Sequence, residues 1–292
     1  MILAPLSKQQ AIKVLMEPQG VLVEEASVYD GGSRWKHSQH VFWGRAKCKL
    51  MKVSVIIPAA GLGTRMGRGA PERAGISRKQ FMLLNNAPIL IHTVRKFVSS
   101  PAVTEIVVAL REDDFIWARE LFATHGLSQS VRLVQGGETR QQSVDNALAT
   151  LSDDTDLVAV HDAVRPFIER EIIEKVIAEA QETGAAIVGI VPVDTVKQVH
   201  RNKVRATLPR ERLILTQTPQ VFRLDLLRRA FEKAREDLFI GTDESSLVER
   251  LEQVEVSVVL GTDRNIKITK PGDMDLARLY LTLEGTVAIG FS

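Results

Sequence analysis

The sequence predicts an α/β fold in which a mostly parallel sheet is flanked by helices. Three observations support this prediction. Apolar runs of strand length alternate with amphipathic segments of helix length between residues 53 and 191. These apolar runs lack regular polar alternation, which is typical of parallel strands that are covered on both faces. From residue 192 the pattern changes to a period of two, as expected for a hairpin that projects from the sheet.

The segment from Val53 to Met66 begins this alternation. Residues 53–57 form a continuous apolar run that predicts a buried strand, and Pro58 ends it. The small residues that follow allow backbone amides to approach an anion, and Arg65 adds a positive charge. Met66 stands where a dinucleotide fingerprint has its third glycine, and no Walker A tripeptide follows. We therefore predict a phosphate-binding turn of another type, although the glycines also suit a simple strand-to-helix turn.

The remaining elements of the core follow in regular order. Helices are predicted at residues 88–99, 115–125, 139–151, 171–183, 224–236, 243–252 and 273–283. Further strands are predicted at residues 104–110, 131–134, 157–162, 186–191 and 254–260. Gly126 and Gly184 follow two of the helices, in the position where glycine often ends a helix. This order predicts a Rossmann-like sheet whose ligands bind at the carboxyl edge of the strands.

Residues 192–217 are predicted to form a β-arm. Two alternating segments, residues 195–199 and 203–208, flank Asn202 as the strands of a hairpin flank a tight turn. An exposed hairpin is commonly covered by a partner. We therefore expect the arm to contact a second copy of the chain in a homodimer.

Composition narrows the class of partner and the compartment. The 292 residues are 45% hydrophobic and 25% charged, with a net charge of only +2, so neither a nucleic acid nor a membrane is an expected partner. No stretch approaches the roughly 20 apolar residues of a membrane span. The single cysteine, Cys48, excludes an internal disulfide framework and suits a reducing cytoplasm. We expect a cytoplasmic protein.

The first fifty residues differ from the rest of the chain. They show no sustained period of 2 or 3.6, and we predict no domain there. Residues 51–292 then form the predicted functional domain. Because Met51 stands just before the first core strand, we hypothesise that it is the natural start and that residues 1–50 are an extension. A short accessory segment is the alternative.

Four further features stand in loops or at predicted strand ends. Lys79 follows a polar segment, residues 67–78, that is predicted to be a mobile flap. Gly137 and Ser143 belong to a glycine turn before a helix, and Asp162 ends a strand. Lys267 lies near the end of the last strand. Each has a plain structural explanation as a solvated charge, a helix cap or a turn, but together they bring cations and backbone amides to one sheet edge.

These residues also carry a resemblance to a known family. The motifs are Pro58-Ala59-Ala60-Gly61-Leu62-Gly63-Thr64-Arg65-Met66, Lys79-Gln80, Gly136-Gly137 with Arg140 and Ser143, His161-Asp162-Ala163 with Arg165-Pro166, Asp194-Thr195 with Lys197, Thr218-Pro219-Gln220, Thr242-Asp243-Glu244 and Asn265-Ile266-Lys267. Over residues 51–283 the chain resembles the 2-C-methyl-D-erythritol 4-phosphate cytidylyltransferases. The resemblance implies a homodimer with an exchanged β-arm that converts CTP and methylerythritol phosphate to a CDP-alcohol and pyrophosphate, with Mg²⁺.

The resemblance also implies roles for individual residues. Catalytic roles fall to Arg65, Lys79, Arg210 and Lys267. Nucleotide binding falls to Pro58, Ala59, Ala60, Gly61, Gly63, Gly137, Ser143 and Asp162. Acceptor binding falls to Asp162, Arg165, Thr195, Arg210, Thr218, Thr242 and Lys267, with Arg210 reaching across the dimer. Mg²⁺ is expected mainly on the CTP phosphates. The flap before Lys79 is longer than the family usually shows.

Three alternatives stay open at this point. A ribitol 5-phosphate cytidylyltransferase shares the same motifs and differs in its acceptor. A sugar-1-phosphate nucleotidyltransferase usually lacks the His-Asp-Ala-x-Arg-Pro pattern found at residues 161–166. A catalytically dead nucleotide-binding scaffold is expected to lose the paired cations, which this sequence retains.

Overall fold

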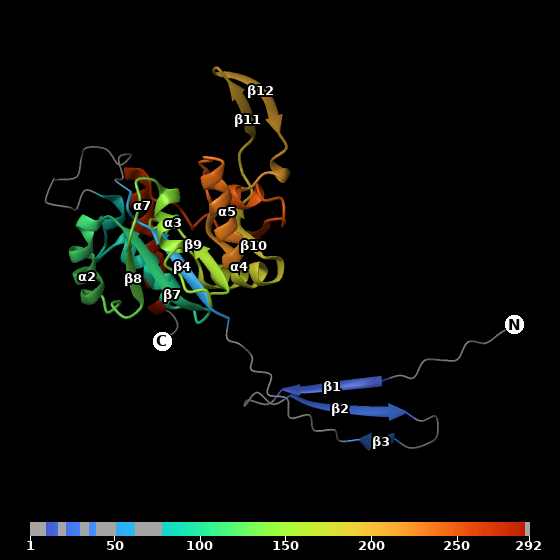
Figure 1. Cartoon of the computed structure of the whole chain (residues 1–292). Coiled ribbons are helices and arrows are strands. Elements are labelled where there is room, and N and C mark those ends of the chain that lie inside the picture. The colour runs from blue at the N-terminus through green and yellow to red at the C-terminus, as the bar shows by residue number, and fades with distance from the viewer. Residues whose placement is uncertain (1–9, 17–21, 30–34, 39–50, 62–77, 290–292) are drawn as a thin grey trace. The chain divides into compact units, whose positions relative to one another are not determined.

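The computed structural model describes residues 10–16, 22–29, 35–38, 51–61 and 78–289. The chain divides into two compact units, Met1–Leu50 and Met51–Ser292 (Figure 1). The first unit holds an antiparallel sheet of β1 (Gln10–Met16), β2 (Leu22–Tyr29) and β3 (Trp35–Ser38), in the order β1-β2-β3. These strands were not predicted because charged and apolar residues do not alternate regularly along them.

The second unit is built on a seven-stranded sheet. Its strands are β4 (Val53–Pro58), β7 (Val103–Leu110), β8 (Val131–Gln135), β9 (Leu157–Val160), β10 (Ala185–Ile190), β13 (Leu215–Arg223) and β14 (Ser257–Leu260). They lie in the order β14-β10-β13-β9-β4-β7-β8. β4 pairs in parallel with both β7 and β9, whereas β13 runs antiparallel to β9 and β10. The predicted α/β fold with a mostly parallel sheet is therefore confirmed.

Within the seven-stranded sheet, β13 is the strand that the sequence did not predict. It begins at Leu215, inside the range assigned to the arm, and it lies near the middle of the sheet. Pro219 is unusual in a central strand, because proline has no N–H to donate to a neighbouring strand. The structure accommodates Pro219 in an irregular stretch, since the pairing with β10 shifts register between Gln220 and Thr216.

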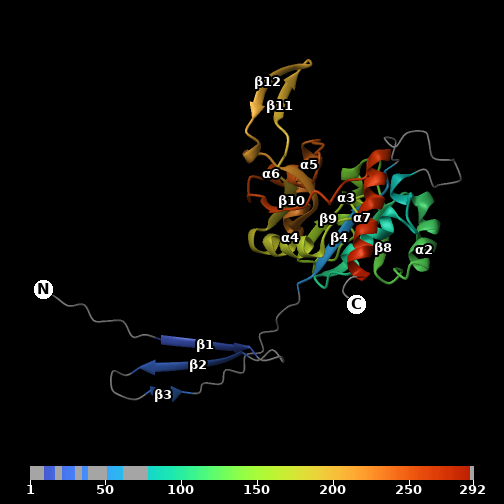
Figure 2. The ribbon, with the colours of Figure 1, turned by 180° about the vertical axis from the view of Figure 1, so that it is seen from behind.

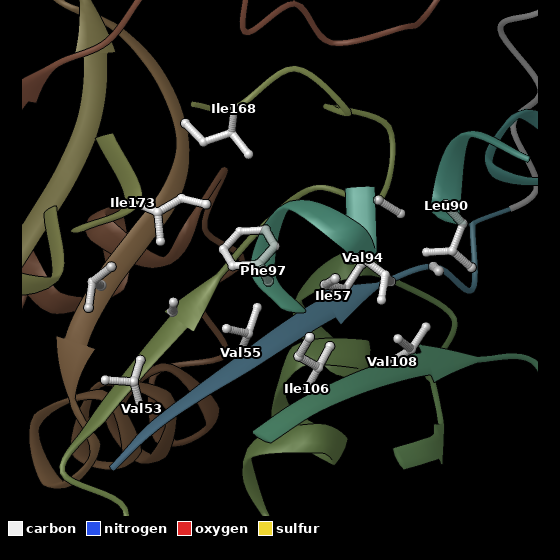
Figure 3. Close-up of a cluster of buried hydrophobic side chains, with 14 of the residues drawn as sticks. Val53, Val55, Ile57, Leu90, Val94, Phe97, Ile106, Val108, Ile168 and Ile173 are labelled. Atoms are coloured by element: carbon white, nitrogen blue, oxygen red, sulfur yellow. The ribbon is translucent and has the colours of Figure 1, made fainter. Parts of the chain in front are cut away.

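Helices cover both faces of the sheet. α1 (Ile89–Val98), α2 (Phe115–Thr124) and α4 (Arg170–Thr183) pack on one face, and α3 (Arg140–Leu148), α5 (Leu224–Glu236) and α6 (Glu244–Glu249) pack on the other. Along β4, Val55 and Ile57 join the first buried cluster (Figure 3), whereas Ile56 joins the second. Both faces of the strand are buried, which explains its unbroken apolar sequence.

The predicted helices are confirmed to within a few residues at their ends, except that the last one is longer than predicted. Gly126 and Gly184 follow α2 and α4 with φ angles of +71° and +92°, a conformation that favours glycine. α7 (Pro271–Ile289) closes the unit (Figure 2), and its Met274 and Ala277 pack against Ile268 in a third buried cluster. The described helices include none with the length and apolar character that crossing a membrane requires.

The predicted hairpin is also confirmed. β11 (Val196–His200) and β12 (Lys203–Leu208) form a separate two-stranded sheet that projects from the body of the unit (Figures 1 and 2). Arg201 and Asn202, at the turn, both have positive φ angles, of 48° and 60°, as a two-residue type I′ turn requires. Val199 and Val204 are 55% and 63% exposed, so the isolated arm leaves apolar side chains uncovered.

Candidate active site

A cavity of about 280 Å³ lies at the carboxyl ends of β4 and β9. Its walls come from the turns after β4, β8 and β9, from the 3₁₀ helix η2 (Lys79–Phe81), from the start of α3 and from the loop before α7. This is the sheet edge at which parallel strands were expected to bind a ligand. The lining residues are Pro58, Ala59, Ala60, Gly61, Lys79, Gln80, Gly137, Glu138, Thr139, Arg140, Ser143, Asp162, Ala163, Val164 and Lys267.

Most of the predicted nucleotide-binding residues meet in this cavity. The residues with predicted roles that line it are Pro58, Ala59, Ala60, Gly61, Lys79, Gly137, Ser143, Asp162 and Lys267. Gly63, Arg65 and the flap at residues 67–77 lie outside the described residues. Arg78, which ends the flap, pairs with Asp114 of η3 (Glu112–Asp114).

The other predicted acceptor residues lie away from the cavity lining. Arg165 and Thr218 are buried behind Asp162. Thr195 and Thr242 are exposed, and the exposed Arg210 donates a hydrogen bond to the carbonyl of Val193. Arg210 begins η4 (Arg210–Arg212), which follows the arm. Within one chain, the structure therefore separates the arm residues from the cavity.

A glycine turn forms one wall of the cavity. A Cβ added to Gly136 would lie 2.6 Å from the Cβ of Ala60 and 3.0 Å from the Oγ of Ser143, so this wall tolerates no side chain. The Ser143 hydroxyl accepts a hydrogen bond from the Gly137 N–H at 3.1 Å and donates one to the Thr139 carbonyl at 2.9 Å. These hydrogen bonds fix the turn to the start of α3, and the turn lies in close contact with Ala60 after β4.

Three cations surround the carboxylate of Asp162. Arg140 Nε lies 3.2 Å from Oδ1, while Arg165 Nε and Lys267 Nζ lie 3.3 Å and 2.8 Å from Oδ2. Burial by itself would raise the pKa of Asp162, but these cations hold that pKa well below its ordinary value. The carboxylate is therefore ionised at neutral pH, with fixed orientation at the floor of the cavity.

Arg140 also joins this carboxylate to a second one. Its guanidinium donates to both oxygens of Glu244, at 2.7 Å and 2.9 Å, in a bidentate pair. The Glu244 side chain is only 2% exposed. Burial opposes the charge on Arg140, but Glu244 and Asp162 raise its pKa above the ordinary value. The start of α3, the end of β9 and the start of α6 are thereby held together.

His161 precedes Asp162 in the chain and is fully buried. Its Nε2 lies 3.0 Å from the Arg165 carbonyl and its Nδ1 lies 3.1 Å from the Thr218 hydroxyl. The Arg165 carbonyl has no hydrogen to donate, so Nε2 of the neutral ring carries the proton. Nδ1 then accepts a hydrogen bond from the Thr218 hydroxyl, which itself accepts the N–H of Asp162 at 3.1 Å. Burial lowers the pKa of His161 to about 4, and the ring is neutral at physiological pH.

Three residues of the site belong to the family motifs, although the resemblance implied no role for them. Gln80 is buried beside Lys79, and Arg140 and Glu244 form the pair described above. The signal for Gln80 was its place next to Lys79 in the motif. No sequence pattern indicated that Arg140 and Glu244, 104 residues apart, would meet.

The arrangement favours binding and transfer of a phosphorylated group. Lys79, Arg140 and Lys267 bring positive charge to the cavity. Its lining also includes the small residues of two turns and the carboxylates of Glu138 and Asp162. Ser143 and His161 direct their hydrogen bonds into the fold, so neither forms part of a nucleophile and base pair. Together with the Rossmann-like sheet, this site defines a nucleotidyltransferase.

Comparison with known proteins identifies the family. Residues 53–283 match the family model for 2-C-methyl-D-erythritol 4-phosphate cytidylyltransferase. Proteins of this name from Solibacter usitatus and Acidobacterium capsulatum are 65% and 50% identical to this chain, over 238 and 236 residues. These alignments cover 80% and 79% of this chain, and 97% and 98% of the two relatives.

A solved structure agrees with these matches. The crystal structure of 4-diphosphocytidyl-2C-methyl-D-erythritol synthase from Anaerococcus prevotii is similar with a TM-score of 0.70 at 30% identity. The match covers 80% of this chain and 96% of that one. The chain therefore belongs to the 2-C-methyl-D-erythritol 4-phosphate cytidylyltransferase family, which confirms the prediction from its motifs.

The close contact at Gly136 predicts a specific effect of Gly136→Ala. The added methyl group must push the turn away from Ala60, at a cost of about 1–3 kcal/mol for an overpacked site. We expect affinity for CTP, measured by calorimetry, to fall about tenfold or more. Gly272→Ala is the control, because a Cβ there meets nothing within 4 Å. Equal affinities in the two variants would contradict the prediction.

The buried His161 predicts how stability depends on pH. An unfolded histidine binds a proton below pH ~6.5, whereas the folded His161 resists protonation until pH is about 4. Between these values the unfolded state holds more protons, so stability falls by about 1.4 kcal/mol for each pH unit of acidification. Denaturant unfolding at pH 7.5, 6 and 5 measures this loss. His161→Gln should lack that component, and an identical pH slope in both proteins would refute the assignment.

Proposed function

We propose that the chain transfers a cytidylyl group from CTP to 2-C-methyl-D-erythritol 4-phosphate, releasing pyrophosphate, in isoprenoid precursor synthesis. The observation that carries the proposal is the cavity in which Lys79, Lys267 and the backbone of two small-residue turns meet. Family membership over residues 53–283 is the reason for proposing CTP as the nucleotide and methylerythritol phosphate as the acceptor.

The proposed reaction requires little covalent help from the protein. A phosphate oxygen of the acceptor attacks the α-phosphorus of CTP, the new P–O bond forms, and the bond to the β-phosphate oxygen breaks as pyrophosphate leaves. The acceptor phosphate is already anionic at neutral pH, so no general base is needed. Positioning and stabilisation of the developing charge then provide the catalysis. A neutral, internally bonded His161 is consistent with this chemistry.

We assign roles to the lining residues on this basis. Lys79, together with Arg65, neutralises charge on the α- and β-phosphates. The backbone at Ala59, Ala60 and Gly137, which line the cavity, contacts cytosine. Asp162 accepts hydrogen bonds from the ribose, because three cations keep its carboxylate ionised and oriented. Lys267 serves the acceptor side, and Arg165 supports that side from behind the cavity lining by orienting Asp162.

Mg²⁺ belongs to the proposal as a partner of the CTP phosphates. No group of three or more candidate side-chain ligands gathers in the part of the chain that the structure describes. The carboxylates that line the cavity are Asp162 and Glu138, and the first is engaged by cations. Because Mg²⁺ prefers phosphate oxygens and water, this lining fits a metal carried by the nucleotide. There the metal neutralises phosphate charge.

We also propose a homodimer in which the arms are exchanged. The arm leaves Val199 and Val204 exposed, and Thr195 and Arg210 lie at its base, outside the cavity of their own chain. A second subunit that accepts the arm would cover these valines and bring Thr195 and Arg210 to its acceptor side. A cytoplasmic location completes the proposal and agrees with the single cysteine, Cys48.

The decisive experiment supplies CTP, ATP, UTP and GTP separately, each with methylerythritol phosphate or ribitol 5-phosphate, and follows pyrophosphate release. We expect turnover with CTP and methylerythritol phosphate, and loss of turnover when EDTA removes Mg²⁺. Turnover with ribitol 5-phosphate alone would overturn the acceptor assignment. Full activity in EDTA would overturn the role of the metal.

Lys79→Ala tests the assignment of this lysine. If Lys79 stabilises charge in the transition state, kcat should fall by about 100-fold or more, as for the loss of a preorganised electrostatic contact. Lys52→Ala serves as the control, because Lys52 lies before β4 and pairs with Asp154 rather than lining the cavity. A near-normal kcat for Lys79→Ala would show that another residue stabilises this charge.

Mixed dimers test whether Arg210 acts across the interface. Lys79→Ala and Arg210→Ala should each be nearly inactive alone. In a mixed dimer with exchanged arms, one site contains an intact Lys79 and receives an intact Arg210. Random mixing should therefore restore about a quarter of the wild-type activity. No restoration after mixing, with dimer exchange verified by native mass spectrometry, would show that both residues act within one chain.

A further inference from the structure

Gln80 occupies a distinctive position at the edge of the cavity. It follows Lys79 in η2, lines the cavity and is only 2% exposed. Its side-chain Nε2 donates hydrogen bonds to the carbonyl of Ala59 at 2.6 Å and to the carbonyl of Gly61 at 3.1 Å. A primary amide nitrogen has two hydrogens, so the two contacts use its full donor capacity. One side chain therefore ties the turn after β4 to the segment that carries Lys79.

These contacts fix the orientation of a peptide group that faces the site. The carbonyl of Ala59 and the N–H of Ala60 belong to one planar trans peptide unit and point in opposite directions. Because Gln80 holds the carbonyl, the Ala60 N–H is directed away from Gln80. Both alanines line the cavity and are buried, at 3% and 7% exposure. The Ala59 N–H is also fixed, by a 2.8 Å hydrogen bond to the Ala109 carbonyl on β7.

The orientation of this peptide matters for choosing a base. Cytosine presents an acceptor at N3 and a donor at its exocyclic amine, whereas uracil presents a donor at N3 and an acceptor at O4. If a peptide unit flips, a donor is exchanged for an acceptor at the same place. A turn that is free to flip would therefore lose much of its preference between the two bases, because either pattern finds a match.

We propose that Gln80 is a positioning residue that sets the preference for cytosine over uracil by preventing the peptide between Ala59 and Ala60 from flipping. The proposal rests on the function proposed above, in which this turn contacts the base. Gln80 does not itself touch the reacting atoms. It acts through the backbone, and its position beside Lys79 keeps the base-contacting turn and the phosphate-contacting lysine in register.

Gln80→Met tests the proposal, because methionine has a similar volume and no hydrogen to donate. We expect the ratio of kcat/KM for CTP to kcat/KM for UTP to fall at least about tenfold, with KM for CTP raised more than kcat is lowered. Calorimetry with CTP and with UTP, in the absence of acceptor, should show the same loss of preference.

Ser54→Ala is the matched control. Ser54 lies near the start of β4, far from the turn, is 1% exposed, and has hydroxyl contacts to Glu105 at 3.1 Å and Thr155 at 3.3 Å. The Ser54→Ala variant also loses two polar contacts inside the fold. Its thermal stability should therefore fall, while its preference for CTP stays at the wild-type value. A wild-type preference in Gln80→Met, or an equal loss of preference in Ser54→Ala, would overturn the proposal.

Two further measurements keep the outcomes separate. If Gln80→Met does not fold, Gln80→Asn replaces it in the test, because asparagine keeps a donor on a side chain too short to reach both carbonyls. The ratio of kcat/KM for CTP to kcat/KM for UTP is then expected to fall in Gln80→Asn. If wild-type protein binds CTP in preference to UTP but shows no turnover with methylerythritol phosphate, the proposed reaction fails, while the binding ratios still test Gln80. Wild-type protein with no preference between CTP and UTP would refute the inference directly.

Discussion

The buried carboxylate of Asp162 is the constraint on which the rest of the site depends. An ionised carboxylate away from water is unfavourable by several kcal/mol unless opposite charges and hydrogen bonds compensate it. Arg140, Arg165 and Lys267 provide this compensation from three separate segments of the chain. The need to neutralise one charge thus determines where the start of α3, the turn after β9 and the loop before α7 meet.

A second layer of hydrogen bonds holds these groups in place. The side-chain amide of Asn265 donates to the Thr218 carbonyl at 2.9 Å, and the main-chain carbonyl of Asn265 accepts a hydrogen bond from Arg165 at 2.7 Å. Thr218 in turn supports the backbone of Asp162 and the ring of His161. β13 therefore supports the site from behind Asp162. A rigid support suits a reaction that depends on positioning rather than on acid or base chemistry.

Local patterns predicted the parts of the fold that local physics decides. Unbroken apolar runs indicated the parallel strands, helical periodicity indicated the helices, and the sequence around Asn202 indicated the hairpin. β13 was not predicted, because Pro219 argues against a central strand and because its antiparallel pairing with β9 and β10 depends on residues distant in the sequence. The strands before residue 51 were not predicted, because their sequence lacks a regular period.

The sequence by itself determined the fold class, the family and most of the residues that line the cavity, because glycine turns and cations at strand ends are local features with direct chemical meaning. Only the tertiary structure decided which charges meet. It paired Arg140 with Glu244, placed Thr218 behind Asp162 rather than in the cavity, and used Gln80 to clamp the turn after β4. These contacts join residues that are distant along the chain, or depend on side-chain directions, and no pattern of neighbouring residues encodes them.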